Sequence, residues 1–282
     1  MAEAISAQAG EARPVGPRRL HPGLAFLGGL LGLGLGYLYV GRIGYAIVFA
    51  VAGYVLTFAA GWTRFVVDPI GWYAFLSGAA LLFLVQLVHP AVLAWSQPVA
   101  PSKPYNRWWW YIAWVAGSTA VSFVLVPDRA TAFGYEHYSI PAGSMSPTVR
   151  PGDRIVVDTW RYRNAPPAFG DIVVCDFGDG TLLVKRVVGV PGDTIELRGP
   201  LLVRNGAPVD EPYLNSEQGM TPRDFAPLTL GADEFFVLGD NRGNSNDSRF
   251  RGPVAGDAIS GRVEFIYFSR DWERFPVVLA AD

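Results

Sequence analysis

The chain has 282 residues, of which 50% are hydrophobic and 17% charged, enough for one large domain or two modest ones. Seven basic and three acidic side chains fall in residues 1–127, whereas 16 basic and 22 acidic ones fall in residues 128–282. No part of the chain has the strongly basic character of a nucleic-acid-binding domain, so we exclude nucleic acid as an expected partner.

Four apolar segments occupy the first half of the chain, at residues 23–40, 45–62, 71–95 and 108–126. Each is close to the roughly 20 residues that cross a bilayer as a helix. The first segment, GLAFLGGLLGLGLGYLYV, is rich in glycine, which permits close helix packing but weakens the helix itself. The fourth begins with RWWWYIAW, where an interfacial aromatic belt would lie. We expect an N-terminal tail over residues 1–22, no cleavable signal peptide, and a multi-span α-helical membrane region over residues 23–127 in contact with the lipid bilayer.

The basic residues do not fix the orientation of this region. If all four segments span, the two sides carry four and three basic side chains, which does not decide between them. The alternatives are an odd number of spans, with one Gly-rich segment re-entrant or interfacial, or a translocated N-terminus. The side with four holds Arg13, Arg18, Arg19 and Arg64, and the side with three holds Arg42, Lys103 and Arg107.

Residues 128–282 change to short runs rich in valine, isoleucine and phenylalanine, separated by turn residues. The Asn-Gly pair in RNGAPV favours a two-residue hairpin turn. We expect an all-β catalytic domain of antiparallel sheets, either packed on one another or partly closed. Cys175 is the only cysteine and is predicted to be a buried apolar residue in a strand. The expected strands are DRIVVD, GDIVVCDF, TLLVKRVVGV, DTIELR, LLVRNGAPV, EFFVLGD and GRVEFIYF.

The turn-rich stretch SIPAGSMSPTVRPGD, residues 139–153, presents Ser144 directly after a glycine. A serine hydroxyl is a weak nucleophile unless a base lies beside it. Only one of the three histidines, His137, lies in this half of the chain, seven residues before the serine on an extended approach. His137 is therefore one candidate base for Ser144.

Lysine usage indicates a second candidate. Among 23 basic side chains only Lys103 and Lys185 are lysines, and Lys185 lies among aliphatic residues in TLLVKRVVGV. Arginine keeps its proton in proteins, whereas a desolvated lysine can lose it. At pH 7 only about one free lysine in 2,500 is neutral, and burial lowers the pKa by up to about 3–5 units. Lys185 is thus a credible general base.

Four motifs together resemble those of bacterial signal peptidase I, a family of membrane-bound serine/lysine endopeptidases that remove signal peptides from exported preproteins. They are IPAGSMSPTVRPGD, DIVVCDF, VKRVVGVPGD and GDNRGNSNDSR, in the family's order and rough spacing over residues 135–268. The resemblance makes Ser144 the nucleophile and Lys185 the general base. Gly143 and Met145 flank the nucleophile as in the family. Further supporting residues are Ser245, similar to a serine that orients the lysine, and Asp247 and Arg249, similar to an ion pair.

The resemblance also implies a setting for the enzyme. Preprotein signal peptides would be cut after small residues, typically alanine, and the protein-export machinery is a further candidate partner. The location would be the bacterial cytoplasmic (inner) membrane, with the catalytic domain on its outer face. No metal or organic cofactor is implied, since one cysteine and one histidine make a poor ligand set. Two departures stand out: family members usually carry one or two spans, and Ala142 replaces a hydroxyl residue that in many members contributes to the oxyanion hole.

The sequence is also compatible with different interpretations of some of these features. Trp160, Tyr162 and Phe169 either dip into the lipid or form a hairpin core. An autoproteolytic repressor would share the serine/lysine site, but the membrane region argues against it. A peptidase dedicated to one exported protein and a catalytically silent scaffold are two more functions that the motifs allow.

Overall fold

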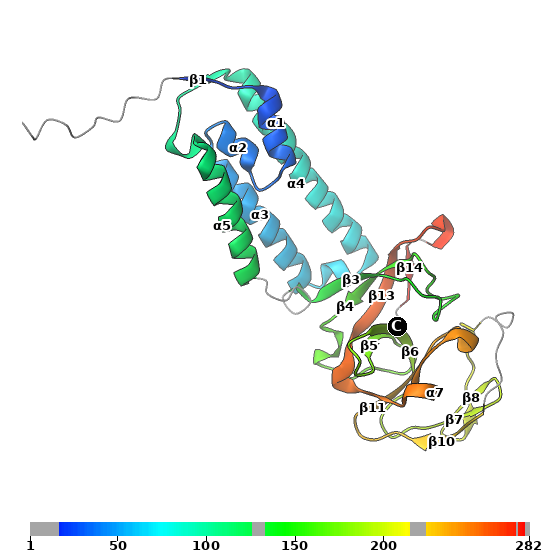
Figure 1. Ribbon diagram of the computed structural model, residues 1–282. Coiled ribbons are helices and arrows are strands. Elements are labelled where there is room, and N and C mark those ends of the chain that lie inside the picture. The colour runs from blue at the N-terminus through cyan, green and yellow to red at the C-terminus, as the bar shows by residue number, and fades with distance from the viewer. Residues whose placement is uncertain (1–16, 126–132, 215–223, 275, 280–282) are drawn as a thin grey trace, which may run out of the picture. The chain divides into compact units, whose positions relative to one another are not determined.

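The computed structural model describes residues 17–125, 133–214, 224–274 and 276–279 (Figure 1). It divides into two compact units. The first comprises residues Met1–Thr57 and Leu76–Pro127, and the second comprises Phe58–Phe75 and Asp128–Asp282. The division falls inside two long helices, α3 (Ile43–Trp62) and α4 (Pro69–Ser96), so that residues 58–75 belong with the β-rich part of the chain.

The first unit is helical. Besides parts of α3 and α4 it contains α1 (Pro22–Leu30), α2 (Leu35–Tyr39) and α5 (Trp108–Leu125). By length and composition, α3 and α4 are each long and apolar enough to cross a membrane. These observations confirm an apolar helical region, with two helices that meet the criterion for a span.

The first apolar segment, residues 23–40, is not one continuous helix. It breaks between α1 and α2, where Gly32, Leu33 and Gly34 have φ values of 77°, 54° and 75°. Glycine adopts this left-handed region without strain. The two short helices pack closely, since a Cβ at Gly28 would lie 2.9 Å from the backbone nitrogen of Gly36. The glycines thus turn the expected straight helix into a tight helical hairpin.

Three connections of the helical unit meet at one end. β1 (Arg18–Arg19) pairs with β2 (Val99–Ala100), which joins the N-terminal tail to the α4–α5 connection. The Asn106 side chain donates to the Leu38 carbonyl oxygen at 2.6 Å, which joins the end of α2 to the same connection. We call this the basic end, because it gathers Arg18, Arg19, Arg42, Lys103 and Arg107.

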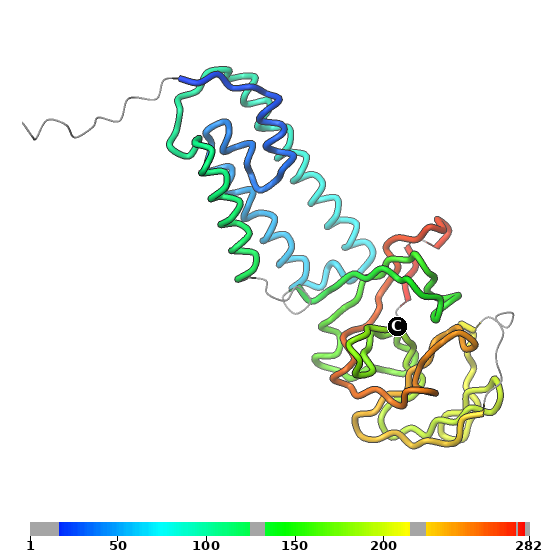
Figure 2. Tube along the Cα trace, in the orientation of Figure 1, coloured from blue at the N-terminus to red at the C-terminus, as the bar shows by residue number. Residues whose placement is uncertain are grey.

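The second unit is built on antiparallel sheets, which confirms the predicted all-β class. The larger, eight-stranded sheet has the order β12-β11-β6-β5-β13-β4-β3, with β14 on β13. It curls on itself (Figure 2). Its strands are β3 (Tyr135–Ser139), β4 (Arg154–Asp158), β5 (Ile172–Asp176), β6 (Leu182–Gly189), β11 (Glu234–Leu238), β12 (Val254–Ala255), β13 (Ile259–Phe268) and β14 (Val277–Val278).

A four-stranded sheet of order β10-β7-β8-β9 completes this unit. Its strands are β7 (Thr194–Arg198), β8 (Leu201–Arg204), β9 (Ala207–Pro208) and β10 (Phe225–Thr229). The predicted Asn-Gly turn joins β8 to β9, with φ values of 53° at Asn205 and 81° at Gly206. Positive φ at both central residues is what a type I′ hairpin turn requires.

Apolar side chains on alternate strand positions fill separate cores. Ile155 and Val157 of β4 belong to a core with Met145 and Val263. Their neighbour Val156 points the other way, into a cluster with Phe265. This alternation follows from the two-residue period of a strand, and it lets β4 contact two cores at once.

Residues 58–75, which include the α3–α4 connection, pack on this second face of the sheet. Trp72 is 6% exposed and makes ring contacts with Phe265, Tyr135 and Tyr267. Arg64 forms an ion pair with Asp158 at the end of β4. The connection between the two long helices is therefore an integral part of the β-rich unit.

Candidate active site

The loop of residues 140–153, which we call the nucleophile loop after the predicted nucleophile Ser144, lies between β3 and β4. Its two ends are tied together by hydrogen bonds from Ile140 N to Asp153 O at 2.9 Å and from Gly152 N to Ile140 O at 2.7 Å. Met145 is 1% exposed and anchors the loop in the core under β4. Because Met145 points inward, its neighbour Ser144 is left at the surface of the loop, half-buried.

Lys185 comes to this serine from β6, 41 residues further along the chain. Its Nζ lies 3.0 Å from Ser144 Oγ and also donates to the Val184 carbonyl oxygen at 3.0 Å. The lysine side chain is only 2% exposed. The structure thus brings together the two residues that the sequence singled out.

The surroundings of Lys185 disfavour its charged form. Burial lowers the pKa of the amine, while the nearby carboxylates of Asp247 and Asp240 act in the opposite direction. Cys175 is itself fully buried on β5, and burial raises the pKa of its thiol to about 12, so the thiol remains neutral. This confirms the prediction that Cys175 is a buried apolar residue. No carboxylate forms an ion pair with Lys185 within the described ranges.

The second candidate base, His137, is placed differently. It lies on β3, paired with Val156, and its side chain is exposed. Its ring contacts the ring of Tyr267 edge-on. The hydrogen bond to Ser144 Oγ comes from the lysine, so the geometry favours Lys185 over His137 as the base.

The start of the GDNRGNSNDSR motif is hydrogen-bonded to the backbone at Ser144. Asn241 N donates to Ser144 O at 3.0 Å, and Asn241 Nδ2 donates to Gly143 O at 3.1 Å. Gly239 permits this approach, since a Cβ there would lie 2.5 Å from Ser144 O. Gly143 differs, because a Cβ on it would make only ordinary contacts, the nearest at 3.6 Å to Ser146 Oγ. Gly239 and Asn241 are positioning residues that the sequence did not single out.

The later part of the motif contains the expected ion pair. Arg249 Nε donates to Asp247 Oδ1 at 2.8 Å, and the two side chains are 5% and 0% exposed. Asp247 also accepts from the backbone N–H of Gly239 at 3.0 Å and caps helix α7 (Ser248–Arg251). The pair therefore fixes the strand end that contacts the nucleophile loop. Ser245 Oγ is buried without a hydrogen-bond partner among the described residues, so its expected contact with the lysine stays a prediction.

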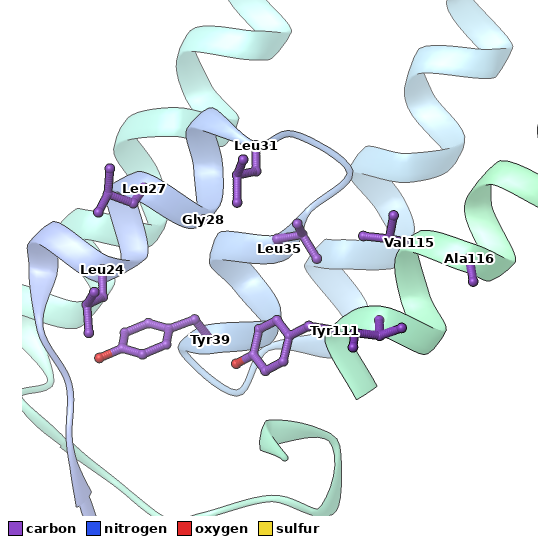
Figure 3. Close-up of a pocket in the computed structure, with 10 residues that line it drawn as sticks. Leu24, Leu27, Gly28, Leu31, Leu35, Tyr39, Tyr111, Val115 and Ala116 are labelled. Carbon is purple, nitrogen blue, oxygen red and sulfur yellow. The ribbon is translucent and has the colours of Figure 1, made fainter. Parts of the chain in front are cut away.

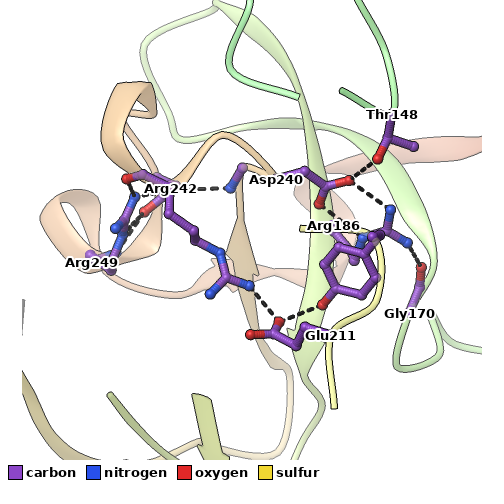
Figure 4. A network of polar contacts seen from close by, with 10 residues as sticks. Thr148, Gly170, Arg186, Glu211, Asp240, Arg242 and Arg249 are labelled. Carbon is purple, nitrogen blue, oxygen red and sulfur yellow. Dashed lines mark hydrogen bonds and ion pairs between the residues drawn. The ribbon is translucent and has the colours of Figure 1, made fainter. Parts of the chain in front are cut away.

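A second buried ion pair joins Arg186, the residue after Lys185, to Asp240 (Figure 4). Arg186, the residue after the lysine, binds Asp240 through two hydrogen bonds of 2.9 and 2.7 Å. Asp240 accepts a third, from the Thr148 hydroxyl at 2.6 Å. The Arg186 guanidinium also donates to Gly170 O at 2.9 Å. This network links the nucleophile loop, β6 and the end of β11. In the sequence it is indicated by Arg186 directly after Lys185 and by Asp240 at the start of the GDNRGNSNDSR motif.

The backbone N–H of Ser144 is available for an oxyanion. It makes no hydrogen bond within the part of the chain that the structure describes. Ala142, two residues earlier, is exposed and adds no side-chain donor. No group of three or more His, Cys, Asp or Glu side chains in the described ranges is placed to hold a metal ion.

The aromatic residues near the 163–170 turn pack within their own unit. Tyr162 is half-buried against the core that contains Val173, and its hydroxyl donates to Asp171 at 2.8 Å. Phe169 packs on the core of the smaller sheet, under the guanidinium of Arg204. Trp160 is also half-buried. The structure therefore favours a core position over insertion into lipid for Tyr162 and Phe169, whereas the ring of Trp160 contacts the exposed Trp62 edge-on and both interpretations remain open for it.

Comparison with known proteins identifies the family. The model of the family described as "Signal peptidase, peptidase S26" matches residues 111–268, which is more than half of the chain. The chain belongs to the signal peptidase family S26. As a member it is a serine endopeptidase of the signal peptidase I type, a hydrolase.

Individual family members match over most of their length. Signal peptidase I of Leptolyngbya laminosa is 39% identical over 185 residues, which is 62% of this chain and 84% of that protein. Signal peptidase I T of Bacillus subtilis (strain 168) is 34% identical over 168 residues, 56% of this chain and 86% of that protein. The crystal structure of a signal peptidase I from Enterococcus faecalis V583 matches with 33% identity and a TM-score of 0.31, covering 34% of this chain and 95% of that one. The resemblance stated from the four motifs is confirmed.

Proposed function

We propose that this member of family S26 is a membrane-bound peptidase that removes N-terminal signal peptides with a Ser144–Lys185 dyad. The observation that carries the proposal is the 3.0 Å contact between Lys185 Nζ and Ser144 Oγ at a lysine that is 2% exposed. A buried amine without an ion-pair partner loses its proton more readily than a free one. In its neutral form it has a lone pair that can accept the hydroxyl proton.

The reaction follows from this geometry. Lys185 takes the proton of Ser144 while Oγ attacks the scissile carbonyl carbon, and the Ser144 N–H donates to the developing oxyanion. The protonated lysine then returns the proton to the leaving amine, which frees the mature chain and leaves the signal peptide as an ester on the serine. In the second half, Lys185 deprotonates a water molecule, which attacks the ester and releases the signal peptide. The Val184 carbonyl oxygen accepts from the amine and holds Nζ in place.

The missing hydroxyl at Ala142 affects the rate rather than the pathway. Removal of one oxyanion donor typically costs about 10²–10³-fold in rate. Restoring the donor by Ala142→Ser therefore tests the oxyanion assignment, and an increase in kcat without a change in KM is expected. The specificity for small residues before the cut is carried over from the resemblance to signal peptidase I.

The proposed topology places the β-rich unit on the side of the membrane opposite to the basic end. α4 has 28 residues, a length of about 42 Å, which exceeds the roughly 30 Å of the hydrocarbon core. Its first residues belong to the β-rich unit, whereas the connection after its last residue pairs with the N-terminal tail. If α4 spans the membrane, its two ends lie on opposite sides.

The helical hairpin α1–α2 changes the distribution of charge. The chain enters and leaves the α1–α2 hairpin on the same side of the membrane. The N-terminal tail, the α2–α3 connection and the α4–α5 connection therefore share that side, in agreement with their contacts at the basic end. It carries five described cations, whereas the α3–α4 connection carries only Arg64. The positive-inside rule then assigns the basic end to the cytoplasm. Three spans and one re-entrant hairpin would place the peptidase unit outside.

The dyad is tested by cleavage of a preprotein with an Ala-x-Ala site by the protein purified in mild detergent. We expect cleavage with the wild type and His137→Ala, and a loss of about 10²–10⁴-fold or more with Ser144→Ala and Lys185→Arg. The rate of the wild type should rise with pH as the lysine loses its proton. Activity that survives in Lys185→Arg would remove the lysine as base and return attention to His137.

The topology is tested separately by cysteine labelling. The single Cys175 is buried, so Cys175→Ser gives a silent background. In intact cells a membrane-impermeant maleimide should label Ala207→Cys in the exposed β9 and leave Lys103→Cys unlabelled until the cells are opened. The reverse pattern would contradict the proposed orientation without affecting the dyad.

A further inference from the structure

The helical unit contains an apolar pocket whose lining includes none of the residues of the peptidase site. It has a volume of about 640 Å³. α1, α2 and α5 contribute its lining, which is largely leucine, isoleucine and valine, with Tyr39 and Tyr111 at one end (Figure 3). Leu27, Leu31 and Ile112 of the lining are 53%, 74% and 60% exposed. In a membrane such a surface contacts acyl chains.

A cation with unsatisfied donors lies at the tyrosine end of the pocket. The guanidinium of Arg18 stacks on the Tyr39 ring, 4.9 Å from its centroid, and lies beside the Tyr111 hydroxyl. Its Nε and Nη2 atoms are buried and have no hydrogen-bond partner among the described residues. Buried guanidinium donors without an acceptor are costly, and an anion is the group that satisfies them best.

The described residues of the helical unit provide no anion here. Residues 17–57 and 76–127 contain no aspartate or glutamate. The remaining cations of the basic end are Arg19, Arg42, Lys103 and Arg107, of which Lys103 and Arg107 are exposed on the connection that leads into α5. Lys103 and Arg107 therefore add uncompensated charge on the connection that leads into α5, the helix that carries Tyr111.

We propose that this pocket is a binding site for an anionic phospholipid. The phosphate accepts hydrogen bonds from Arg18 and lies among the cations of the basic end, and one acyl chain follows the leucine-lined pocket between α1 and α5. This arrangement combines apolar burial with the attraction of basic side chains for anionic headgroups, worth about 1 kcal/mol per Lys or Arg near the surface. The site requires the membrane location proposed above, but it is independent of the dyad.

The test uses the full-length protein in dodecyl maltoside and measures lipid retention by native mass spectrometry during titration. The probes are dioleoyl phosphatidylglycerol and dioleoyl phosphatidylcholine, which share their acyl chains and differ in net charge. We expect the anionic lipid to bind with one-to-one stoichiometry and the zwitterionic lipid to bind more weakly. Arg18→Gln should weaken binding of the anionic lipid about fivefold, the ratio that corresponds to about 1 kcal/mol.

Matched controls separate this site from general attraction. Arg19→Gln removes the same charge from the exposed neighbour and should weaken binding less than Arg18→Gln, because only Arg18 contacts Tyr39 and Tyr111 at the pocket among the described residues. Leu27→Trp fills the pocket and should weaken binding of the anionic lipid without any change in charge. Cleavage of a soluble peptide by each variant confirms that the peptidase unit is folded.

Several outcomes would overturn the proposal. Equal binding of the two lipids, or equal losses in Arg18→Gln and Arg19→Gln, would show that no specific headgroup site exists. Competition by inorganic phosphate at millimolar concentration would identify a free-anion site instead of a lipid site. Displacement of the lipid by an uncharged 20-residue apolar helix, with no effect of Arg18→Gln, would assign the pocket to a transmembrane partner.

Discussion

Gly239→Ala tests whether the close contact between the end of β11 and the nucleophile loop sets the position of Ser144. A Cβ at this position would lie 2.5 Å from the Ser144 carbonyl oxygen and would overlap the Ser245 side chain. Ordinary Cβ contacts begin at 3.4 Å. The serine carbonyl would therefore have to recede by about 0.9 Å to restore van der Waals contact, which also stretches its 3.0 Å hydrogen bond from Asn241 N.

The expected loss follows from that displacement. Misplacement of a reacting group by about 1 Å costs on the order of 10²-fold in rate. The substitution should lower kcat by about this factor and leave KM nearly unchanged, because the serine, not the substrate, has moved. Overpacking of this kind also typically lowers the free energy of unfolding by about 1–3 kcal/mol.

The assay is steady-state cleavage of a fluorogenic peptide with an Ala-x-Ala site, combined with thermal unfolding in the same detergent. Gly231→Ala, in the connection before β11, is the matched control, since its Cβ would meet only the carboxylate end of Glu234, at 3.3 Å. A Gly239→Ala enzyme with the kcat of the wild type would refute the view that this contact positions the nucleophile. A loss of stability with unchanged kcat would reduce Gly239 to a packing role.

Three further predictions concern the same unit. Burial lowers the pKa of Lys185 in the folded protein. Between the pKa values of the folded and unfolded states the unfolded chain binds more protons, so the free energy of unfolding should rise with pH in that window. In denaturant titrations, Lys185→Met should be more stable than the wild type at neutral pH and should lack this part of the pH dependence. Asp247→Asn leaves the buried guanidinium of Arg249 unpaired and should cost about 3–5 kcal/mol of unfolding free energy, and an undiminished midpoint would contradict that. Trp72→Ala should destabilise the β-rich unit by about 3–5 kcal/mol, whereas Trp62→Ala, at a side chain 79% exposed, should have little effect on thermal unfolding.

The β-rich unit could be predicted from sequence where apolar alternation and turn residues coincide. RIVVD and IVVCD became β4 and β5, and the Asn205–Gly206 pair became the β8–β9 turn. The strand YEHYS was missed, because it carries polar residues on an edge of the sheet. The short strands β12 and β14 were also missed, since two residues carry no periodic signal and are defined only by their partners.

The sequence predicted the reactive pair Ser144 and Lys185, but not the residues Gly239 and Asn241 that contact the nucleophile loop. Lys185 stood out because it is the only lysine among the aliphatic residues of a strand. Asn241 and Gly239 looked like ordinary turn formers. Their role depends on contacts with a loop far away in the sequence, and Asn241 and Gly143, for example, are 98 residues apart. The break of residues 23–40 into a hairpin could not be chosen over a continuous span, because glycine content alone does not distinguish a loosely packed span from a turn.

The order of the segments along the chain has a consequence for biosynthesis. Ser144 precedes Lys185 by 41 residues, and the asparagine that fixes the serine loop follows later still. A nascent chain that ends before β11 thus contains both members of the dyad but lacks the strand and motif that align them. On the proposed mechanism, the site is therefore complete only once the last third of the unit has been made, and we expect shorter nascent chains to be inactive.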